Sequence, residues 1–340
     1  MKGSQLRFVS AADVAGLRLT RQEILQSVEG AVRAQGEGDV VLEPRMHLMP
    51  PNGGKGHFNV LRGYVGTENV CGVKIVGDFV DNYRLGLPSE LALVNLFDPE
   101  TGIPLGIVDA TMITSARTGA LTALGAKHLA RPDSKILGHI GSRGTAWWNV
   151  TMLDDLFDFD EIRVTSKRPE SRDAFAENLS EHLGKSVKAV TTAEEAIVGA
   201  DIMVEASRLT EPTPLVRTEW VTPGTFVVPY GTVSAVELSL TEVMDKVVVD
   251  DWGQARAGQF GALRRHVDEG LLTKDTLHAE LGDIVAGNAS GREQADERIL
   301  FWHRGLATTD VALAYLILQR AEDAGLGTIL PNDYGSGANG

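Results

Sequence analysis

Three cations lie inside otherwise apolar stretches in the first part of the chain. Arg45 stands in PRMHLM, Lys74 in GVKIV and Arg117 in ITSARTGAL. A single cation of this kind is often a side chain whose stem is buried while its charge reaches water. Three of them together instead indicate a basic pocket for a carboxylate, which Arg117 could bind as a fork and Lys74 as a point charge.

Other polar side chains are candidates to complete such a site. Arg62 could bind a second carboxylate or simply face solvent, and solvent is the favoured interpretation. Asp310 opens the last helical stretch, where the helix dipole alone would favour a carboxylate. His303 and Tyr230 are further candidates for moving a proton, although a histidine is more often structural. The eight histidines show no HxxxH or HExxH spacing, so no metal site is predicted.

A glycine-rich turn follows the apolar stretch ILGHI and precedes a helical stretch. It reads Gly141, Ser142, Arg143, Gly144, Thr145, Ala146. A strand that ends in glycines and enters a helix offers free N–H groups and a helix dipole to a pyrophosphate. The usual G-x-G-x-x-G/A spacing would have glycine where Arg143 stands, so Gly144 could take over the close approach and Arg143 could pair with phosphate. The alternative is a plain turn without a ligand.

The end of the next predicted strand bears on the choice of cofactor. A cofactor without a 2′-phosphate usually meets an acidic residue at this point. Here EIRVT leads into Ser166, Lys167 and Arg168, so two cations and a hydroxyl replace the acid. This suits NADP(H) better than NAD(H), although NAD(H) stays possible. The alternative is a basic turn that only contacts water.

Strands and helices alternate from about residue 134 onward, which predicts a parallel sheet with right-handed crossovers. Before it come a helix over 20–35, several paired strands, a hairpin around residues 98–102 and an Ala- and Leu-rich helix. The predicted fold is therefore α/β. A Rossmann-type doubly wound sheet at 131–305 is inserted in a mixed α+β substrate-binding and dimerisation domain, formed by 1–130 and 306–340.

Composition narrows the classes of protein and of partner. The chain has 340 residues, 43% of them hydrophobic, and a net charge of −14, which makes nucleic acid an unfavourable partner. The one cysteine, Cys71, excludes a disulfide within the chain. Apolar runs fall short of the roughly 18 residues that a membrane span needs, and no targeting signal is visible. The default expectation is a cytoplasmic protein.

With these motifs in view, the sequence resembles the ornithine cyclodeaminase/mu-crystallin family over nearly its whole length. The motifs that carry the resemblance, besides the glycine turn, are EPRMHL, CGVKIV, DPETGIPLGIVDATMITSARTGAL, KHLARPDS, VVVDDWGQ, LHAELGDIVAG and GLATTDVALAYLI. The stretch from Asp245 to Gly327 is similar to the branch of N-(2-amino-2-carboxyethyl)-L-glutamate dehydrogenases, which serve 2,3-diaminopropionate synthesis.

The resemblance implies a homodimer in which the N-terminal domain supplies the dimer interface and the substrate groups. It implies nicotinamide chemistry at an amine- or imine-bearing carbon beside the carboxylate of a small amino-acid-derived substrate. The family's carboxylate-binding positions fall on Arg45, Lys74 and Arg117, and an acidic family position falls on Asp310. The expected catalytic set is Lys74, Asp310, His303 and Tyr230. The cofactor contacts are expected to include Thr114, Ala206 and Ser207 as well.

One departure from the family pattern bears on the reaction. Cyclodeaminases of the family have an aspartate where this sequence has Gly231, and the surrounding PYGTVS contains no acid. A one-way hydride transfer at an imine or amine needs fewer proton transfers from this loop than a complete deamination cycle does. The expected function is therefore an NAD(P)-dependent amino-acid dehydrogenase or imine reductase. The alternatives are an ornithine cyclodeaminase that gives proline and a non-catalytic NADPH-binding protein like mu-crystallin.

Overall fold

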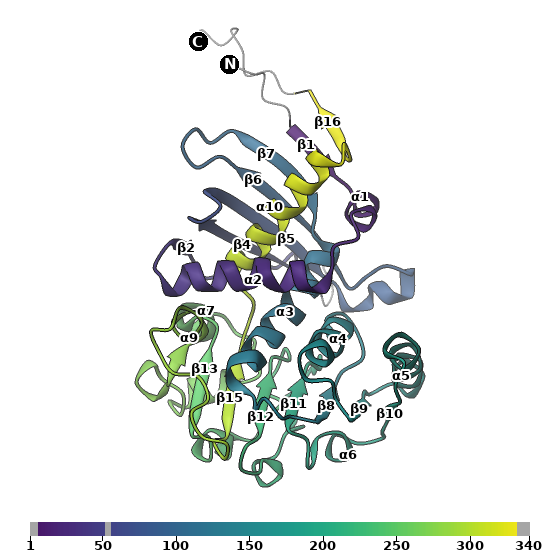
Figure 1. The fold of residues 1–340 in the computed structure, drawn as a ribbon, viewed down its shortest axis with the longest axis vertical. Coiled ribbons are helices and arrows are strands. Elements are labelled where there is room, and N and C mark those ends of the chain that lie inside the picture. The colour runs from purple at the N-terminus through teal and green to yellow at the C-terminus, as the bar shows by residue number, and fades with distance from the viewer. Residues whose placement is uncertain (1–5, 52–55, 332–340) are drawn as a thin grey trace. The chain divides into compact units, whose positions relative to one another are not determined.

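The computed structural model describes residues 6–51 and 56–331, which divide into two compact units (Figure 1). The first unit comprises Met1–Arg117 and Leu306–Gly340, and the second comprises Thr118–Gly305. The domain boundaries expected from the sequence, after residues 130 and 305, stay a prediction. The first division between the compact units falls inside a helix, after Arg117.

The first unit is built on a mixed sheet in the order β16-β1-β7-β6-β5-β4-β2, with β3 also paired to β4. All pairs are antiparallel except β1 with β7. The predicted hairpin joins β6 to β7. The strands are β1 (Leu6–Val9), β2 (Val40–Leu42), β3 (Met46–Leu48), β4 (His57–Val65), β5 (Val70–Asp78), β6 (Glu90–Phe97), β7 (Pro104–Asp109) and β16 (Thr328–Leu330).

The helices described in the first unit are α1 (Ala11–Gly16), α2 (Arg21–Gly36), η1 (Val80–Leu85), the start of α3 (Thr111–Leu129) and α10 (Ala307–Asp323). Helix α10 crosses one face of the sheet and packs against β4, β5 and α2 (Figure 1). Glycines permit this close approach, since a Cβ atom at Gly72 would lie 2.6 Å from Val311 of α10. The packing places the first turn of α10 against the middle of β5.

The opposite face of the mixed sheet exposes apolar side chains. Strand register places Met46, Val60, Ile75 and Leu93 in one row across β3, β4, β5 and β6. Met46 is 58% exposed, Ile75 43% and Leu93 42%. Leu91 lies on the same face and is exposed to a similar degree. No element of the described chain covers this row.

The second unit is a parallel sheet in the order β10-β9-β8-β11-β12-β15-β13-β14. The direction of the strand order reverses between β8 and β11, which is where doubly wound sheets bind dinucleotides. This arrangement confirms the predicted fold class. The strands are β8 (Ile136–Ile140), β9 (Glu161–Thr165), β10 (Val187–Ala189), β11 (Ile202–Glu205), β12 (Phe226–Pro229), β13 (Lys246–Val249), β14 (Ala279–Glu280) and β15 (Ile299–Trp302).

The helices of the second unit lie between these strands along the chain. They are α4 (Ala146–Phe157), α5 (Pro169–Leu183), α6 (Ala193–Ile197), η2 (Thr218–Trp220), η3 (Leu238–Glu242), α7 (Trp252–Arg256), α8 (Arg264–Asp268), η4 (Lys274–Thr276) and α9 (Leu281–Ala286). Every residue of β11, β12, β13 and β15 is buried, as expected for a parallel sheet covered on both faces. Within residues 6–51 and 56–331, no helix has both the length and the hydropathy needed to cross a membrane.

Candidate active site

Three of the predicted residues form a buried charged cluster in the first unit. Asp310, in the first turn of α10, accepts a hydrogen bond at Oδ1 from Lys74 Nζ at 2.7 Å and from Arg117 Nε at 2.8 Å. The three side chains are 0%, 1% and 5% exposed, respectively. Thr114 lies one helical turn before Arg117 on α3 and accepts a longer contact from Lys74 Nζ, at 3.4 Å. The fold thus brings β5, α3 and α10 together at one carboxylate oxygen.

The cluster has more positive than negative groups, and some of its polar atoms are unused. Burial and the charge of Arg117 lower the pKa of Lys74 to about 8, against the opposing effect of Asp310. Asp310 Oδ2 has no hydrogen-bond partner among the described residues. The terminal nitrogens of Arg117 likewise bond to no described residue, because its one bond uses Nε. The cluster therefore offers a guanidinium fork and one free carboxylate oxygen to a ligand.

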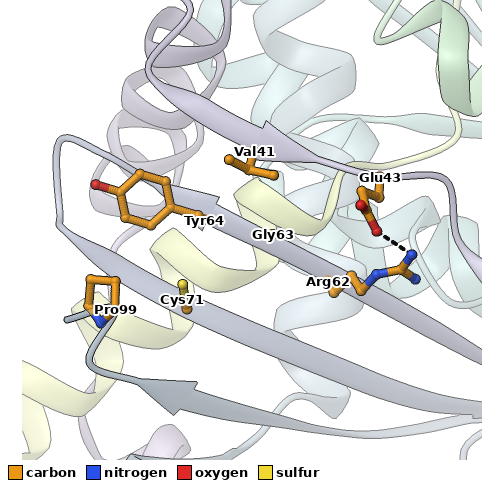
Figure 2. Close-up of a pocket in the computed structure, with 7 residues that line it drawn as sticks. All are labelled: Val41, Glu43, Arg62, Gly63, Tyr64, Cys71 and Pro99. Carbon is orange, nitrogen blue, oxygen red and sulfur yellow. Dashed lines mark ion pairs between the residues drawn. The ribbon is translucent and has the colours of Figure 1, made fainter. Parts of the chain in front are cut away.

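Of the other two predicted substrate-binding cations, Arg62 lies on the opposite face of the mixed sheet. Leu61 pairs with Lys74 across β4 and β5, so Arg62 points to the opposite face. There Arg62 forms an ion pair with Glu43 and lines an open hollow of about 420 Å³ beside Tyr64 (Figure 2). Arg45 is half-buried and directly precedes the edge strand β3. The structure does not bring Arg62 to Lys74.

The predicted glycine turn connects β8 to α4. Gly141 has a φ of 114°, and a Cβ atom there would lie 2.9 Å from the Ala206 carbonyl oxygen, so both backbone and packing require glycine. Gly144 has a φ of 57° and open space where a Cβ atom would be. That open space, with the N–H groups at the start of α4, fits a diphosphate. Arg143 is exposed and extends towards Ser171 of α5.

The predicted 2′-phosphate residues follow β9 directly. Ser166 is half-buried and accepts a hydrogen bond from Ser142 Oγ at 2.9 Å, which ties this turn to the glycine turn. Lys167 and Arg168 are exposed. The two turns therefore meet at the ends of neighbouring strands, and the turn after β9 bears two exposed cations.

Two predicted proton-transfer residues come together in the second unit. The rings of Tyr230 and His303 stack with their centroids 4.5 Å apart. His303 Nε2 lies 2.9 Å from Thr122 Oγ1 of α3. The hydroxyl of Tyr230 forms short hydrogen bonds with Thr145, just before α4, and with Asn149 within it. Tyr230 is thus attached to the start of the helix that follows the glycine turn.

Glu205 is a buried carboxyl group that the sequence reasoning missed. It ends β11, is fully buried, and accepts hydrogen bonds from the N–H groups of Ser207 at 2.7 Å and Gly231 at 3.2 Å. The Ser207 hydroxyl also donates to it. Burial raises the pKa of Glu205 to about 7. An acid closing the apolar strand IMV was the available signal in the sequence.

Glu205 also explains why residue 231 is glycine. A Cβ atom at Gly231 would lie 2.6 Å from Glu205 Oε2 and 2.8 Å from the Ser207 carbonyl oxygen. No side chain fits there while Glu205 keeps this position. The missing aspartate at 231 is therefore a packing consequence of the acid at the end of the neighbouring strand. Ser207, predicted to contact the cofactor, uses its own N–H and O–H on Glu205.

The parallel sheet with its glycine turn and the buried cation–carboxylate cluster are together those of an NAD(P)-dependent oxidoreductase. Comparison with known proteins gives the family: residues 5–325 match the model of the ornithine cyclodeaminase/mu-crystallin family, and the chain belongs to it. This confirms the resemblance seen in the sequence.

Individual relatives align over almost the whole chain. The structure of Thermococcus litoralis Δ1-pyrroline-2-carboxylate reductase with NADH and L-proline is 31% identical, with a TM-score of 0.89, covering 96% of this chain and 100% of that one. An archaeal alanine dehydrogenase dimer with bound NAD is 30% identical, with a TM-score of 0.87, covering 96% and 99%. The N-((2S)-2-amino-2-carboxyethyl)-L-glutamate dehydrogenase of Staphylococcus aureus is 29% identical, covering 91% and 93%.

Proposed function

We propose that the protein is an amino-acid dehydrogenase or imine reductase, which transfers hydride between a nicotinamide cofactor and a carbon that bears an amine or imine beside a carboxylate. The observation that carries this proposal is the Lys74–Arg117–Asp310 cluster. Its free guanidinium nitrogens and free carboxylate oxygen match the two ends of an α-imino acid, a carboxylate and an N–H group. Relatives that act on proline- and alanine-type substrates support it.

Each cluster residue has a role that follows from its contacts. The Nη groups of Arg117 bind the substrate carboxylate, because Nε is already held by Asp310. Asp310 Oδ2 accepts the N–H of the substrate and so orients the C–N bond. Lys74, with its pKa near 8, holds or releases a proton at the substrate nitrogen. A bound nicotinamide supplies the hydride for reduction of the imine, which together with one proton gives the amine.

A dehydrogenase fits the second unit better than a cyclodeaminase does. The loop after β12 has no acid, and Gly231 has no room for one. The nearest carboxylate, Glu205, is fully buried and already accepts three hydrogen bonds. Ring closure and ammonia loss would need a second proton-handling carboxylate besides Asp310, which the loop after β12 does not supply, whereas hydride transfer to an iminium ion needs none in this loop.

The cofactor is proposed to be NADP(H) in preference to NAD(H). Lys167 and Arg168 are exposed at the end of β9, and Ser166 beside them carries a hydroxyl where an NAD-binding chain would have an acid. Relatives with known structures hold NADH or NAD, so a preference for NADP(H) would distinguish this chain from them. Within the family, the motifs after Asp245 favour an N-substituted diamino acid as substrate.

A homodimer is proposed to form through the exposed face of the mixed sheet. The row containing Met46, Ile75 and Leu93 is apolar and lies on the face opposite α10. Apolar patches of this kind on a sheet are usually covered by another surface. The archaeal alanine dehydrogenase is a dimer, which supports a second copy of this chain as the partner. A cytoplasmic location stays a prediction from the sequence.

A substrate panel tests the function. Purified protein is mixed with NADPH or NADH and either Δ1-pyrroline-2-carboxylate or pyruvate with ammonia. In the reverse direction it is mixed with L-proline, L-alanine or N-(2-amino-2-carboxyethyl)-L-glutamate and the oxidised cofactor. We expect a change in the absorbance of reduced nicotinamide with at least one carboxylate substrate. Ammonia and proline from ornithine without net change in cofactor would overturn the proposal, as would cofactor binding without any turnover.

A further inference from the structure

Four buried or half-buried side chains form a chain of hydrogen bonds in the second unit. His139, on β8, contacts Asn149 of α4, with 3.1 Å between Nε2 and Nδ2. Asn149 Nδ2 also donates to the hydroxyl of Tyr230, which in turn bonds to Thr145 Oγ1. Thr145 directly precedes α4, at the end of the glycine turn. These hydrogen bonds therefore link the buried strand β8 to the turn that is proposed to hold the cofactor diphosphate.

The direction of these hydrogen bonds follows from their first member. His139 Nδ1 lies 2.9 Å from the Gly141 carbonyl oxygen, which can only accept, so Nδ1 carries the proton. Burial lowers the pKa of His139 to about 4, so its ring is neutral and Nε2 is an acceptor. Asn149 must then present its NH₂ group to Nε2. The opposite amide orientation would set Oδ1 against an unprotonated nitrogen.

The same amide group determines what Tyr230 does. Asn149 donates to the Tyr230 hydroxyl oxygen. In the short bond between Tyr230 and Thr145 Oγ1 either oxygen can be the donor, and the donor role is assigned to Tyr230 because its oxygen already accepts from Asn149. The Thr145 hydroxyl, which accepts this hydrogen bond, can donate its own proton to an acceptor that is not one of these four side chains. Stacking against His303, with ring planes at 29°, holds the tyrosine ring in place.

We propose that Tyr230 is a positioning residue for the cofactor, which orients the Thr145 hydroxyl so that it donates to a phosphate oxygen of the bound dinucleotide. This inference rests on the proposed function and replaces the expectation that Tyr230 is the proton donor. With this assignment, Tyr230 donates to Thr145 and accepts from Asn149, so it is poorly placed to protonate a substrate. It is well placed to fix the phosphate turn.

The experiment measures binding of ADP-ribose, which has the diphosphate but no nicotinamide, by isothermal titration calorimetry. The variants are Tyr230→Phe, Thr145→Val and their combination, with Thr145→Ser as the control that keeps the hydroxyl. We expect Thr145→Val to weaken ADP-ribose by about tenfold, the usual effect of losing a hydrogen bond to a charged group. Tyr230→Phe should weaken it several-fold, and Thr145→Ser should bind like the parent protein.

The double variant provides the decisive comparison. If Tyr230 acts through Thr145, then Tyr230→Phe has no further effect in the Thr145→Val background. Thermal unfolding of each variant identifies losses that come from a damaged fold. The inference is overturned if the losses add, or if Tyr230→Phe loses turnover while keeping full affinity for ADP-ribose. Failure of the parent protein to bind either ADP-ribose or NADP⁺ would instead overturn the proposed function.

Discussion

Several buried residues in this protein depend on one contact partner that is distant in the sequence. Lys74 and Arg117 meet at one oxygen of Asp310, and each would be a costly buried charge without it. Glu205 and Gly231 form a second pair, since the carboxylate occupies the space that any side chain at 231 would need. Sequence reasoning identified Gly231 as a departure from the family but not its cause. The cause lies 26 positions earlier, on a neighbouring strand.

The buried Glu205 should make stability fall as pH rises. Its folded pKa of about 7 lies above the ordinary value of 4.5, so the folded state holds a proton that the unfolded state releases. Stability is therefore highest below about pH 4.5 for this group and is lost as pH rises to about 7, by roughly 3 kcal/mol in total. Glu205→Gln removes this dependence.

Urea unfolding of parent and Glu205→Gln proteins between about pH 5 and about pH 8 measures the difference. A hydrogen bond lost in the glutamine variant lowers its unfolding free energy by the same amount at each pH. The test is therefore how the difference in unfolding free energy between parent and variant changes with pH. We expect the parent to lose stability relative to the variant as pH rises. A difference that stays constant over this range would show that Glu205 is ionised in the folded protein throughout.

The sequence predicted individual helices and hairpins better than it predicted which strands lie next to each other in a sheet. The helix expected at 20–35 is Arg21–Gly36, and the hairpin around 98–102 joins β6 to β7, because local periodicity and turn residues determine both. The parallel sheet followed from the alternation of strands and helices. Its full order did not, since β15 enters between β12 and β13 although β13 and β14 precede it in the chain. Nothing local encodes that insertion.

The site was predictable in its residue types and less so in its geometry. Lys74 and Asp310 lie 236 positions apart and meet only because α10 packs on β5. Arg62 was an additional candidate for which solvent exposure was favoured, and strand register directs it to the face opposite Lys74. The expected domain boundary after residue 130 followed the helix breaker near Pro132. The compact units divide inside α3, where the sequence has no break.

The turn after β9 should determine cofactor preference. Replacing Lys167 and Arg168 with glutamine removes both exposed cations without changing side-chain length greatly. We expect NADPH binding to weaken by about tenfold or more and NADH binding to change little, because only NADPH carries the 2′-phosphate. Fluorescence titration with each cofactor gives the two dissociation constants.

Lys274→Gln, at an exposed lysine of η4 in the same unit, is the control for loss of general charge. It should affect the two cofactors equally and weakly. Equal weakening of NADPH and NADH by the Lys167 and Arg168 changes would contradict the assignment of these residues to the 2′-phosphate.

At the scale of the whole molecule, two surface properties stand out. The chain is acidic, with a net charge of −14, which favours solubility and disfavours polyanionic partners. Against that background, the mixed sheet has an uncovered apolar face that includes Ile75, Leu91 and Leu93. An exposed apolar face of this kind promotes aggregation of a monomer, whereas in a symmetric dimer it can form the interface.

Lysine substitutions at Ile75 and Leu93 should therefore dissociate the proposed dimer. Burying two added charges per protomer in an apolar interface is strongly unfavourable, because neither finds a partner there. Sedimentation velocity should show a dimer for the parent protein and a monomer for the double variant. Leu156→Lys, at a similarly exposed leucine of α4, is the control and should remain dimeric. A monomeric parent protein at micromolar concentration would refute the proposed interface.

The proposed function depends on Arg117 binding the carboxylate next to the reacting C–N bond. The most direct measurement compares kcat/KM for Δ1-pyrroline-2-carboxylate and for 1-pyrroline, the same ring without the carboxylate, in the parent protein and in Arg117→Gln. The variant leaves Lys74 paired with Asp310, so the cluster keeps a balanced charge, and cofactor binding serves as the control. We predict that the parent prefers the carboxylate substrate by about a hundredfold or more and that the variant loses most of this preference. An unchanged ratio in a variant that still binds cofactor would show that Arg117 does not bind this carboxylate.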